Sequence, residues 1–386
     1  MYFGYPVFTN RNSGFQAIVI PHCAEGQGFA FFEQRQAFGE VAFAGCPLTN
    51  DVADLISPCV ETFASQAFNS TARMCGRLVL TNLVSGGCDF SGCKFDSVEI
   101  SSDRLVTLTG QFGAVSNVVI HTPNLLTIDA YTFGYAPITN DVADVIPAGV
   151  ANMPGTGAFR SCPNLRGCLV LTNMVYIGRP GNDSYTFDNC RSLQEIRVSG
   201  PHWSTFDGNN VFGNCTSVTN VVLASPCLTM IPNGAFVSST RIGTVDLQLP
   251  ALTNIVGSAF YGCSALTNLT IAATNLTTVS PYAFWGCPFR SVTFLGPAPS
   301  PAAMSNLFFN VAADTKDTGV HPCTIYVSKH QAGWTKLIDR TFTAHESTNV
   351  PAGCLGVYTN SAGRKAWVVH KAVPADGLRY FYIHVR

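Results

Sequence analysis

The chain has 386 residues, of which 47% are hydrophobic and 12% charged, and its formal net charge is −1. This balance argues against a nucleic-acid-binding protein or a protein held on anionic membranes by basic charge, and no apolar run is long enough to span a membrane. The charged share is about half the usual one, so Thr, Ser, Asn and Gly must supply the polar surface, as is usual in extracellular β-rich proteins.

The N-terminal end gives two expectations. Residues 1–6 carry neither a basic segment nor a long apolar run, so we expect no signal peptide in this chain. Phe8 heads the first expected repeat unit, and a solenoid that opens on such a unit exposes its core. We therefore expect a neighbouring subunit or further repeats to cover this end.

A loose repeat follows. Phenylalanines recur at intervals of 21 to 26 residues, and the residue three positions after each is small. They are Phe43, Phe68, Phe90, Phe112, Phe133 and Phe159. A longer duplication lies over this repeat, because the segment 47–54 recurs almost unchanged as 137–144. Several repeat units were therefore copied together as a block.

The repeat becomes regular further along the chain. Phe187, Phe212, Phe236, Phe260 and Phe284 are 24 or 25 residues apart. Positions 6, 9 and 11 after the first four are all aliphatic: Leu193, Ile196, Val198, Val218, Val221, Leu223, Ile242, Val245, Leu247, Leu266, Leu269 and Ile271. This spacing makes a short strand with alternate residues inward, and stacked units bury one continuous core.

We therefore predict an α/β-type repeat protein, mostly β, that folds as a right-handed leucine-rich-repeat solenoid with a parallel sheet. Residues 252–269, read as LTNIVGSAFYGCSALTNL, resemble the BspA-like class of leucine-rich repeats. The resemblance covers roughly residues 7–296, although alanine precedes the phenylalanine in only six of eleven units. It implies a bacterial or protist surface or secreted protein that mediates adhesion or binds host proteins, and it brings no catalytic residues.

The period ends at residue 297, where a proline-rich segment begins. We expect the solenoid over 1–296, an exit segment with one terminal strand over 297–338, and a small antiparallel β domain over 339–386. In the exit segment, 324–327 reads as a strand and 331–340 as a short helix. In the last part, strands at 355–358, 365–369 and 378–385 are expected to cap the solenoid.

The cysteines and carboxylates are given structural roles. Cysteine occupies the position three after the phenylalanine in most units, and we expect a reduced, buried ladder, with disulfides as the alternative. Asp51/Asp54 and Asp141/Asp144 come from the block duplication and are expected to cap turns, with calcium or acid–base chemistry as the alternative. No zinc spacing or catalytic motif is present, so we expect no metal, no cofactor and no enzyme.

The outward strand residues are the first candidate binding surface. A core must repeat, whereas a binding face need not, and these positions differ between units. They are Arg197, Val222, Asp246, Thr270 and Thr293, with Asn220 and Asn268 beside them and Glu99 and Val119 further back. The alternative is a solvated, Thr-rich sheet. A second candidate is Tyr261 with Trp285, which follow the repeat phenylalanine in adjacent units and are expected to be exposed and stacked.

Two functions follow from this pattern. One is an extracellular or cell-surface binding or adhesion protein that presents the strand face to a protein or glycan partner. The other is a structural or assembly component, such as part of a surface layer or a phage particle, built on the same scaffold.

Overall fold

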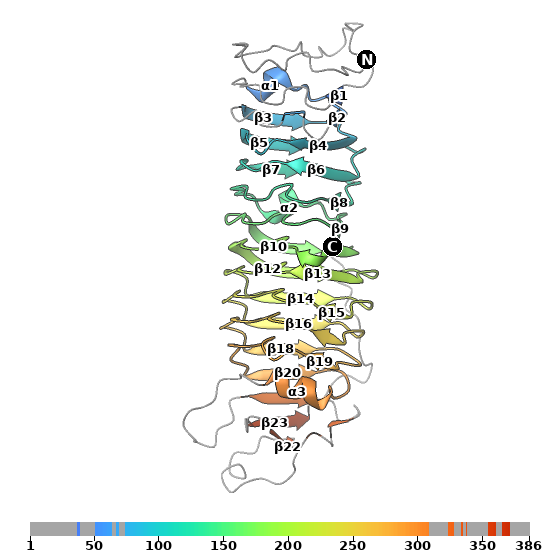
Figure 1. Ribbon diagram of the computed structural model, residues 1–386, viewed down its shortest axis with the longest axis vertical. Helices are drawn as coiled ribbons and strands as arrows, with labels where there is room; N and C mark the ends of the chain where they lie inside the picture. Colours follow the sequence, from blue (N-terminus) through green and yellow to red (C-terminus); the bar gives the residue numbers. More distant parts are fainter. Residues whose placement is uncertain are drawn as a thin grey trace. The chain divides into compact units, whose positions relative to one another are not determined.

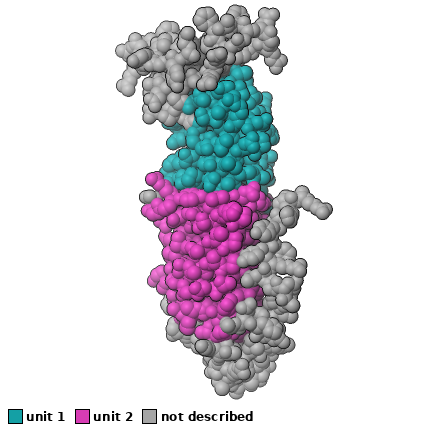
Figure 2. All heavy atoms as spheres, turned by 90° about the vertical axis from the view of Figure 1, so that its right-hand side faces the viewer, with its two compact units in different colours: residues 1–168, 185–193 teal, residues 169–184, 194–386 magenta. Residues whose placement is uncertain are grey.

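The computed structural model describes residues 37–38, 51–63, 67–68, 74–308, 323–327, 333–334, 337, 354–359 and 365–370. The chain forms two compact units, residues 1–168 with 185–193 and residues 169–184 with 194–386 (Figure 2). In each unit, short parallel strands from successive coils lie one above the next (Figure 1). The prediction of a mostly β leucine-rich-repeat solenoid is therefore confirmed.

The first unit has two parallel sheets. One contains, in spatial order, β1 (Ala37–Phe38), β2 (Thr62–Phe63), β4 (Ser85–Asp89), β6 (Thr107–Gln111), β8 (Thr127–Ile128) and β9 (Asn152–Met153). The other contains β3 (Cys75–Leu80), β5 (Lys94–Ile100) and β7 (Val118–Ile120). The coils of β4, β6 and β8 contribute one strand to each of two walls, and the core lies between these walls.

The second unit repeats this plan. Its main sheet runs β10 (Arg166–Leu171), β12 (Ser192–Ser199), β14 (Asn220–Ala224), β16 (Thr244–Gln248), β18 (Asn268–Ile271), β20 (Ser291–Phe294), β21 (Thr324–Val327), β23 (Lys365–His370) and β22 (Cys354–Thr359). Strands β10 and β12 begin in the first unit. The opposite wall holds β11 (Tyr176–Asp183) paired with β13 (Thr205–Asn209), and then β15 (Met230–Ile231), β17 (Asn254–Ile255) and β19 (Thr278–Val279).

The core has the predicted register. In β18, Leu269 and Ile271 are buried, because alternate residues of a strand point to the same face. The phenylalanines stack along the solenoid: the ring of Phe260 lies 5.0 Å from that of Phe236 and 5.0 Å from that of Phe284. In the first unit, the rings of Phe112, Phe133 and Phe159 stack at 5.5 Å.

In several coils, the residue three after the phenylalanine donates a side-chain hydrogen bond to the preceding coil. Sγ of Cys263 donates to the carbonyl oxygen of Phe236 at 3.2 Å. Where Ser239 takes this position, its hydroxyl donates to the carbonyl oxygen of Phe212 at 3.1 Å. The position takes a small side chain and favours one with a donor group. Cys190, Cys215, Cys263 and Cys287 are all buried there, and Cys263 and Cys287 are free thiols, as predicted for a reduced ladder.

These thiols are expected to be unreactive in the folded protein. Burial raises the pKa of Cys162 to about 12 and raises that of Cys287 well above its usual value, and the thiolate is the nucleophile. In native protein treated with iodoacetamide, peptide mapping should find Cys162, Cys263 and Cys287 unlabelled, and Cys59 and Cys227, which are exposed, labelled. Denaturation without reductant should then expose the buried thiols to the reagent. Recovery of these residues as disulfides would contradict the ladder.

The duplicated aspartates begin two short helices. The Asp51 carboxylate accepts a hydrogen bond from the backbone N–H of Ala53 at 2.9 Å, at the start of α1 (Val52–Leu55). The Asp141 carboxylate accepts one from Ala143 at 3.0 Å, at the start of α2 (Val142–Val145). The predicted capping role is confirmed for both, while the side chain of Asp54 lies outside the described residues.

The C-terminal strands continue the main sheet. Strand β21 pairs in parallel with β20, β23 pairs in parallel with β21, and β22 pairs antiparallel with β23. The predicted hairpin of the two strands at 355–358 and 365–369 is therefore confirmed. The exit segment also contains a helix that was not predicted, α3 (Pro301–Leu307). The hydroxyl of Ser300 accepts a hydrogen bond from the N–H of Ala303 at 3.1 Å, and Pro301 fits the first helical position.

Some of the predicted elements cannot be compared with the structure. The units of Phe8 and Phe43, most of the helix at 331–340 and the strand at 378–385 lie outside the described residues. The domain boundaries at 296 and 338 stay predictions. Within the described part of the chain, no helix has both the length and the apolar character that crossing a membrane requires.

Candidate binding surfaces

Outward residues of neighbouring strands form one row in the second unit. The strand register places Arg197 opposite Val222, Val222 opposite Asp246, Asp246 opposite Thr270, and Thr270 opposite Thr293. The predicted alignment of these residues is therefore confirmed. We call Arg197, Val222, Asp246 and Thr270 the strand-face stripe.

The stripe ends before Thr293. Its four residues are half-buried, whereas Thr293 is only 6% exposed. Placing Thr293 on the exposed surface is therefore wrong. Its neighbour in register on β21 is Tyr326, and side chains directly opposite each other on one face of a sheet lie in contact. The tyrosine thus stands between Thr293 and water on that side.

The charged side chains of the strand face bond to neighbours on the same face. The Arg197 guanidinium lies 2.8 Å from Oε1 of Glu195, and the Asn220 amide donates to that same oxygen. The Gln248 amide donates to the Asp246 carboxylate at 2.7 Å. Burial raises the pKa of Asp246, and the hydrogen bond from Gln248 opposes this rise. The charge of Arg197 is therefore balanced on the face by Glu195, whereas the carboxyl of Asp246 has a neutral amide as its partner.

Hydrogen bonds between coils orient the flank of the stripe. The hydroxyl of Thr219 donates to the carbonyl oxygen of Gln194 at 3.3 Å, and that of Thr267 to Gly243 at 3.4 Å. The exposed Asn268 amide donates to the Thr267 hydroxyl at 3.1 Å. The threonine-rich surface is therefore an ordered array, which loses little entropy when a partner binds.

The first unit carries a corresponding row by itself. The register places Val79 opposite Glu99 and Glu99 opposite Val119, as the sequence predicted for the last two. Glu99 forms an ion pair with Arg77 on the neighbouring strand. Here, too, the charged residue of the row has its partner on the same face.

The aromatic patch lies at the turns that follow the phenylalanine ladder. Tyr261 and Trp285 are 40% and 38% exposed, as predicted. The expected stacking of these two rings is wrong: the ring of Trp285 packs against Tyr282, with centroids 5.5 Å apart and planes at 50°. Sequence reasoning missed Tyr282, which is 55% exposed. Tyr282 lies three residues before Trp285, and the Trp285 N–H donates to the Tyr282 carbonyl oxygen across the turn. This spacing could have indicated the contact between the two rings.

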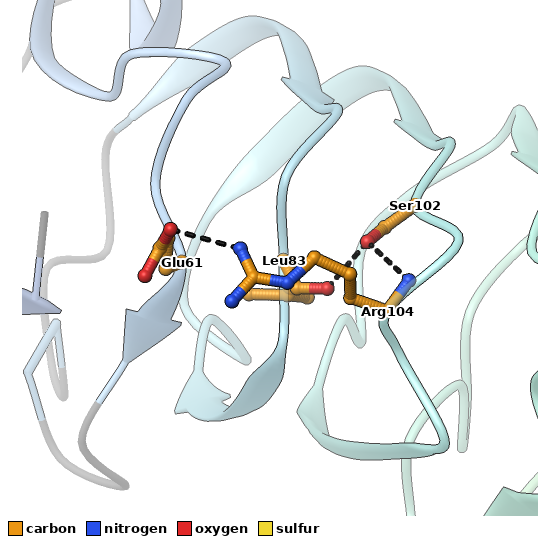
Figure 3. Close-up of polar contacts among 4 residues, drawn as sticks. All are labelled: Glu61, Leu83, Ser102 and Arg104. Atoms are coloured by element: carbon orange, nitrogen blue, oxygen red, sulfur yellow. Dashed lines mark hydrogen bonds and ion pairs between the residues drawn. The ribbon is translucent and has the colours of Figure 1, made fainter. Parts of the chain in front are cut away.

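Polar contacts in the first unit connect successive coils. The Arg104 guanidinium lies 2.9 Å from the Glu61 carboxylate, past the intervening coil of Leu83 (Figure 3). The Ser102 hydroxyl donates to the Leu83 carbonyl oxygen at 2.6 Å and accepts from the Arg104 N–H at 3.2 Å. These contacts connect three coils, so they stabilise the scaffold.

Among the residues that the structure describes, no group of three or more His, Cys, Asp or Glu could hold a metal ion.

Comparisons with known proteins identify the repeat. The family described as BspA type leucine-rich repeat region matches residues 154–290 in six copies, a shorter range than residues 7–296. Among curated proteins, none matches the chain.

Solved structures of three bacterial proteins are similar. A leucine-rich cell surface protein of Faecalibacterium prausnitzii is 19% identical, with 68% of this chain and 77% of that one covered and a TM-score of 0.36. A leucine-rich-repeat protein of Bacteroides ovatus is 14% identical, with 67% and 70% covered and a TM-score of 0.39. The pneumococcal vaccine antigen PcpA is 13% identical, with 81% and 89% covered and a TM-score of 0.24.

Proposed function

We propose that the chain, whose residues 154–290 match the BspA type leucine-rich repeat region, is an extracellular or cell-surface binding protein with a role in adhesion and no catalysis of its own. The composition supports this location, because 12% charged residues and a surface of Thr, Ser and Asn suit an extracellular β-rich protein. The partner in this proposal is another protein.

The strand-face stripe is the observation that carries the proposal. Its four residues are aligned by strand pairing, differ in chemistry and remain partly exposed, while the inward residues beside them are uniformly apolar. A regular sheet offers an extended area, and a stable protein interface needs about 800 Å² on each side. Charge is sparse on the stripe, because Arg197 is already paired with Glu195 and Asp246 lies two coils away, so binding should depend only weakly on salt.

A triple variant of the stripe tests this proposal. Combining Arg197→Glu, Val222→Glu and Thr270→Arg should weaken capture of the protein partner about tenfold or more, because charge repulsion and bulk are introduced along the whole contact. Capture from the natural surroundings of the cell, followed by titration of the isolated partner, measures the effect. Circular dichroism should show an unchanged fold.

The matched control lies on the opposite wall of the same unit. Met230, Asn254 and Thr278 are also aligned by strand register. A variant with Met230→Glu, Asn254→Glu and Thr278→Arg introduces the same side chains, two glutamates and one arginine, and should bind at wild-type strength. Wild-type binding by a folded stripe variant would exclude the strand face, and capture of a glycan alone would exclude the protein partner.

A structural or assembly role is the second candidate, and one feature of the first unit favours it. Val106 and Leu126 are 47% and 46% exposed and lie in adjacent coils, where the Leu126 N–H donates to the Val106 carbonyl oxygen at 2.9 Å. Neighbouring exposed aliphatic side chains suit a contact between copies. A concentration-dependent oligomer that Leu126→Ser dissociates would favour assembly, while a monomer at all concentrations would favour the binding role.

A further inference from the structure

Three aromatic residues form one exposed surface in the second unit. The rings of Tyr282 and Trp285 touch within a single turn, and the turn of Tyr261 belongs to the preceding coil. That turn is joined to the Trp285 turn, because the Gly262 N–H donates to the Trp285 carbonyl oxygen at 2.8 Å. Tyr282 is 55% exposed, and the other two rings are about equally exposed at 40% and 38%. We call Tyr261, Tyr282 and Trp285 the aromatic platform.

The platform stands in a segment without charge. From Leu247 to Phe289 the chain contains no Asp, Glu, Lys, Arg or His. The polar groups near the turns are hydroxyls and amides: Ser280 accepts from the Gly257 N–H at 2.8 Å, and the Asn233 side chain accepts from the Ser258 N–H at 2.9 Å. Within this segment, a ligand meets apolar ring faces beside neutral hydrogen-bonding groups, and the charged residues that border the segment in the sequence are Asp246 and Arg290.

We propose that the aromatic platform binds a neutral glycan. The C–H faces of a pyranose ring are apolar and pack on aromatic rings, while its hydroxyls bond to neutral donors and acceptors at the edge. Adjacent coils are about 4.8 Å apart, close to the length of one sugar residue. Tyr261 and the Tyr282–Trp285 pair lie on adjacent, hydrogen-bonded coils, so one glycan chain can contact both.

The surrounding chemistry separates this ligand from others. An anionic glycan or a nucleic acid would need cationic side chains to compensate its charge, and the segment has none. Protein hot spots combine aromatic residues with arginine and lie in desolvated pockets, whereas these rings are exposed on turns beside glycines. Tyr261 and Trp285 are each followed by a glycine with a positive φ, Gly262 at 75° and Gly286 at 80°. The absence of side chains at these glycines leaves access to the rings open.

Affinity electrophoresis of the full chain tests the proposal. Gels containing soluble β-glucan, galactomannan or starch serve as neutral probes, and gels with polygalacturonate or heparin serve as charged comparisons. The wild-type chain should be retarded by at least one neutral polysaccharide and by neither charged one. Trp285→Ala and Tyr282→Ala should each weaken the retardation about tenfold, Tyr261→Ala less, and Trp285→Phe should retain part of it.

Two controls make the result specific. Tyr135 is an equally accessible tyrosine of the first unit, 56% exposed and with φ at 66°. Tyr135→Asn tolerates that backbone and should leave retardation unchanged. The triple stripe variant should also leave it unchanged, so that failure of the glycan proposal and failure of the strand-face proposal can be told apart.

Four outcomes would overturn the proposal that the aromatic platform binds a neutral glycan. They are no retardation by any neutral polysaccharide, retardation by the charged polymers alone, full retardation of a folded Trp285→Ala chain, and a dimer in size-exclusion chromatography that Trp285→Ala dissociates. The last would assign the surface to contacts between copies.

Discussion

Replacing Phe260 by alanine is expected to lower the free energy of unfolding by roughly 3–5 kcal/mol. The ring is fully buried and lies between two others, with its plane at 9° to that of Phe236 and at 3° to that of Phe284. Truncation removes the buried area and leaves a cavity between two stacked rings. The neighbouring coils cannot collapse into the gap, because strand pairing on both walls holds their spacing.

Equilibrium denaturation by urea, followed by circular dichroism, measures this loss. The adjacent residue supplies the control, since the ring of Tyr261 is 40% exposed and Tyr261→Ala should change stability by less than about 0.5 kcal/mol. Because each coil of a repeat protein contacts only its neighbours, Phe260→Ala should also separate the melting of its coils from the rest and broaden the transition. A loss below about 1 kcal/mol would mean that the stacked phenylalanines are not the core of the solenoid.

Whether a residue points into the core or outward could be predicted from the sequence, because residues that recur at the repeat period occupy the same position in every coil. Phe260, Leu266 and Leu269 recur at constant spacing, and only a residue that meets the same environment in every coil is constrained in this way. Strand pairing then aligned the outward residues Arg197 and Val222 as predicted. Repetition therefore gives the core and the direction in which each side chain points.

The surroundings of an outward residue could not be predicted in the same way. Thr293 has an outward strand position but is covered, because its register neighbour Tyr326 comes from beyond the irregular exit segment. The contact of Tyr282 with Trp285 depends on the shape of one turn, which the period does not encode. Helix α3 follows from a local capping signal at Ser300 within a segment whose prolines suggested only turns.

The roles of the candidate surfaces are even harder to predict from the sequence. Glu195 was not among the predicted residues, yet its carboxylate joins Arg197 and Asn220. Exposed positions are free to vary, so their chemistry becomes readable only once the fold shows which of them are neighbours. The strand-face stripe and the aromatic platform therefore rest on register and exposure, and their functions rest on the binding experiments.

Replacing Gly167 by alanine is expected to cost about 2–4 kcal/mol, because two separate penalties add. Gly167 has φ at +91°, and a Cβ at this position would lie 2.2 Å from the Asp141 carboxylate. That carboxylate caps α2 through the Ala143 N–H, so the new methyl group must displace the cap. The block duplication preserved the arrangement, since Gly76 has φ at +89° and would bring its Cβ 2.3 Å from the capping Asp51.

A double-mutant cycle separates the two penalties. Asp141→Ala alone should cost about 1 kcal/mol for the lost cap. The double variant should cost less than the sum of the single ones, because the clash disappears with the carboxylate. Gly181→Ala is the matched control: its φ is +69°, but nothing lies within 4 Å of the added Cβ, so it should cost only about 1–2 kcal/mol of backbone strain. Additive costs of the two single substitutions would show that the new methyl group and the Asp141 carboxylate do not compete for the same space. The geometry shared by the two copies of the duplicated block would then have to come from backbone conformation alone.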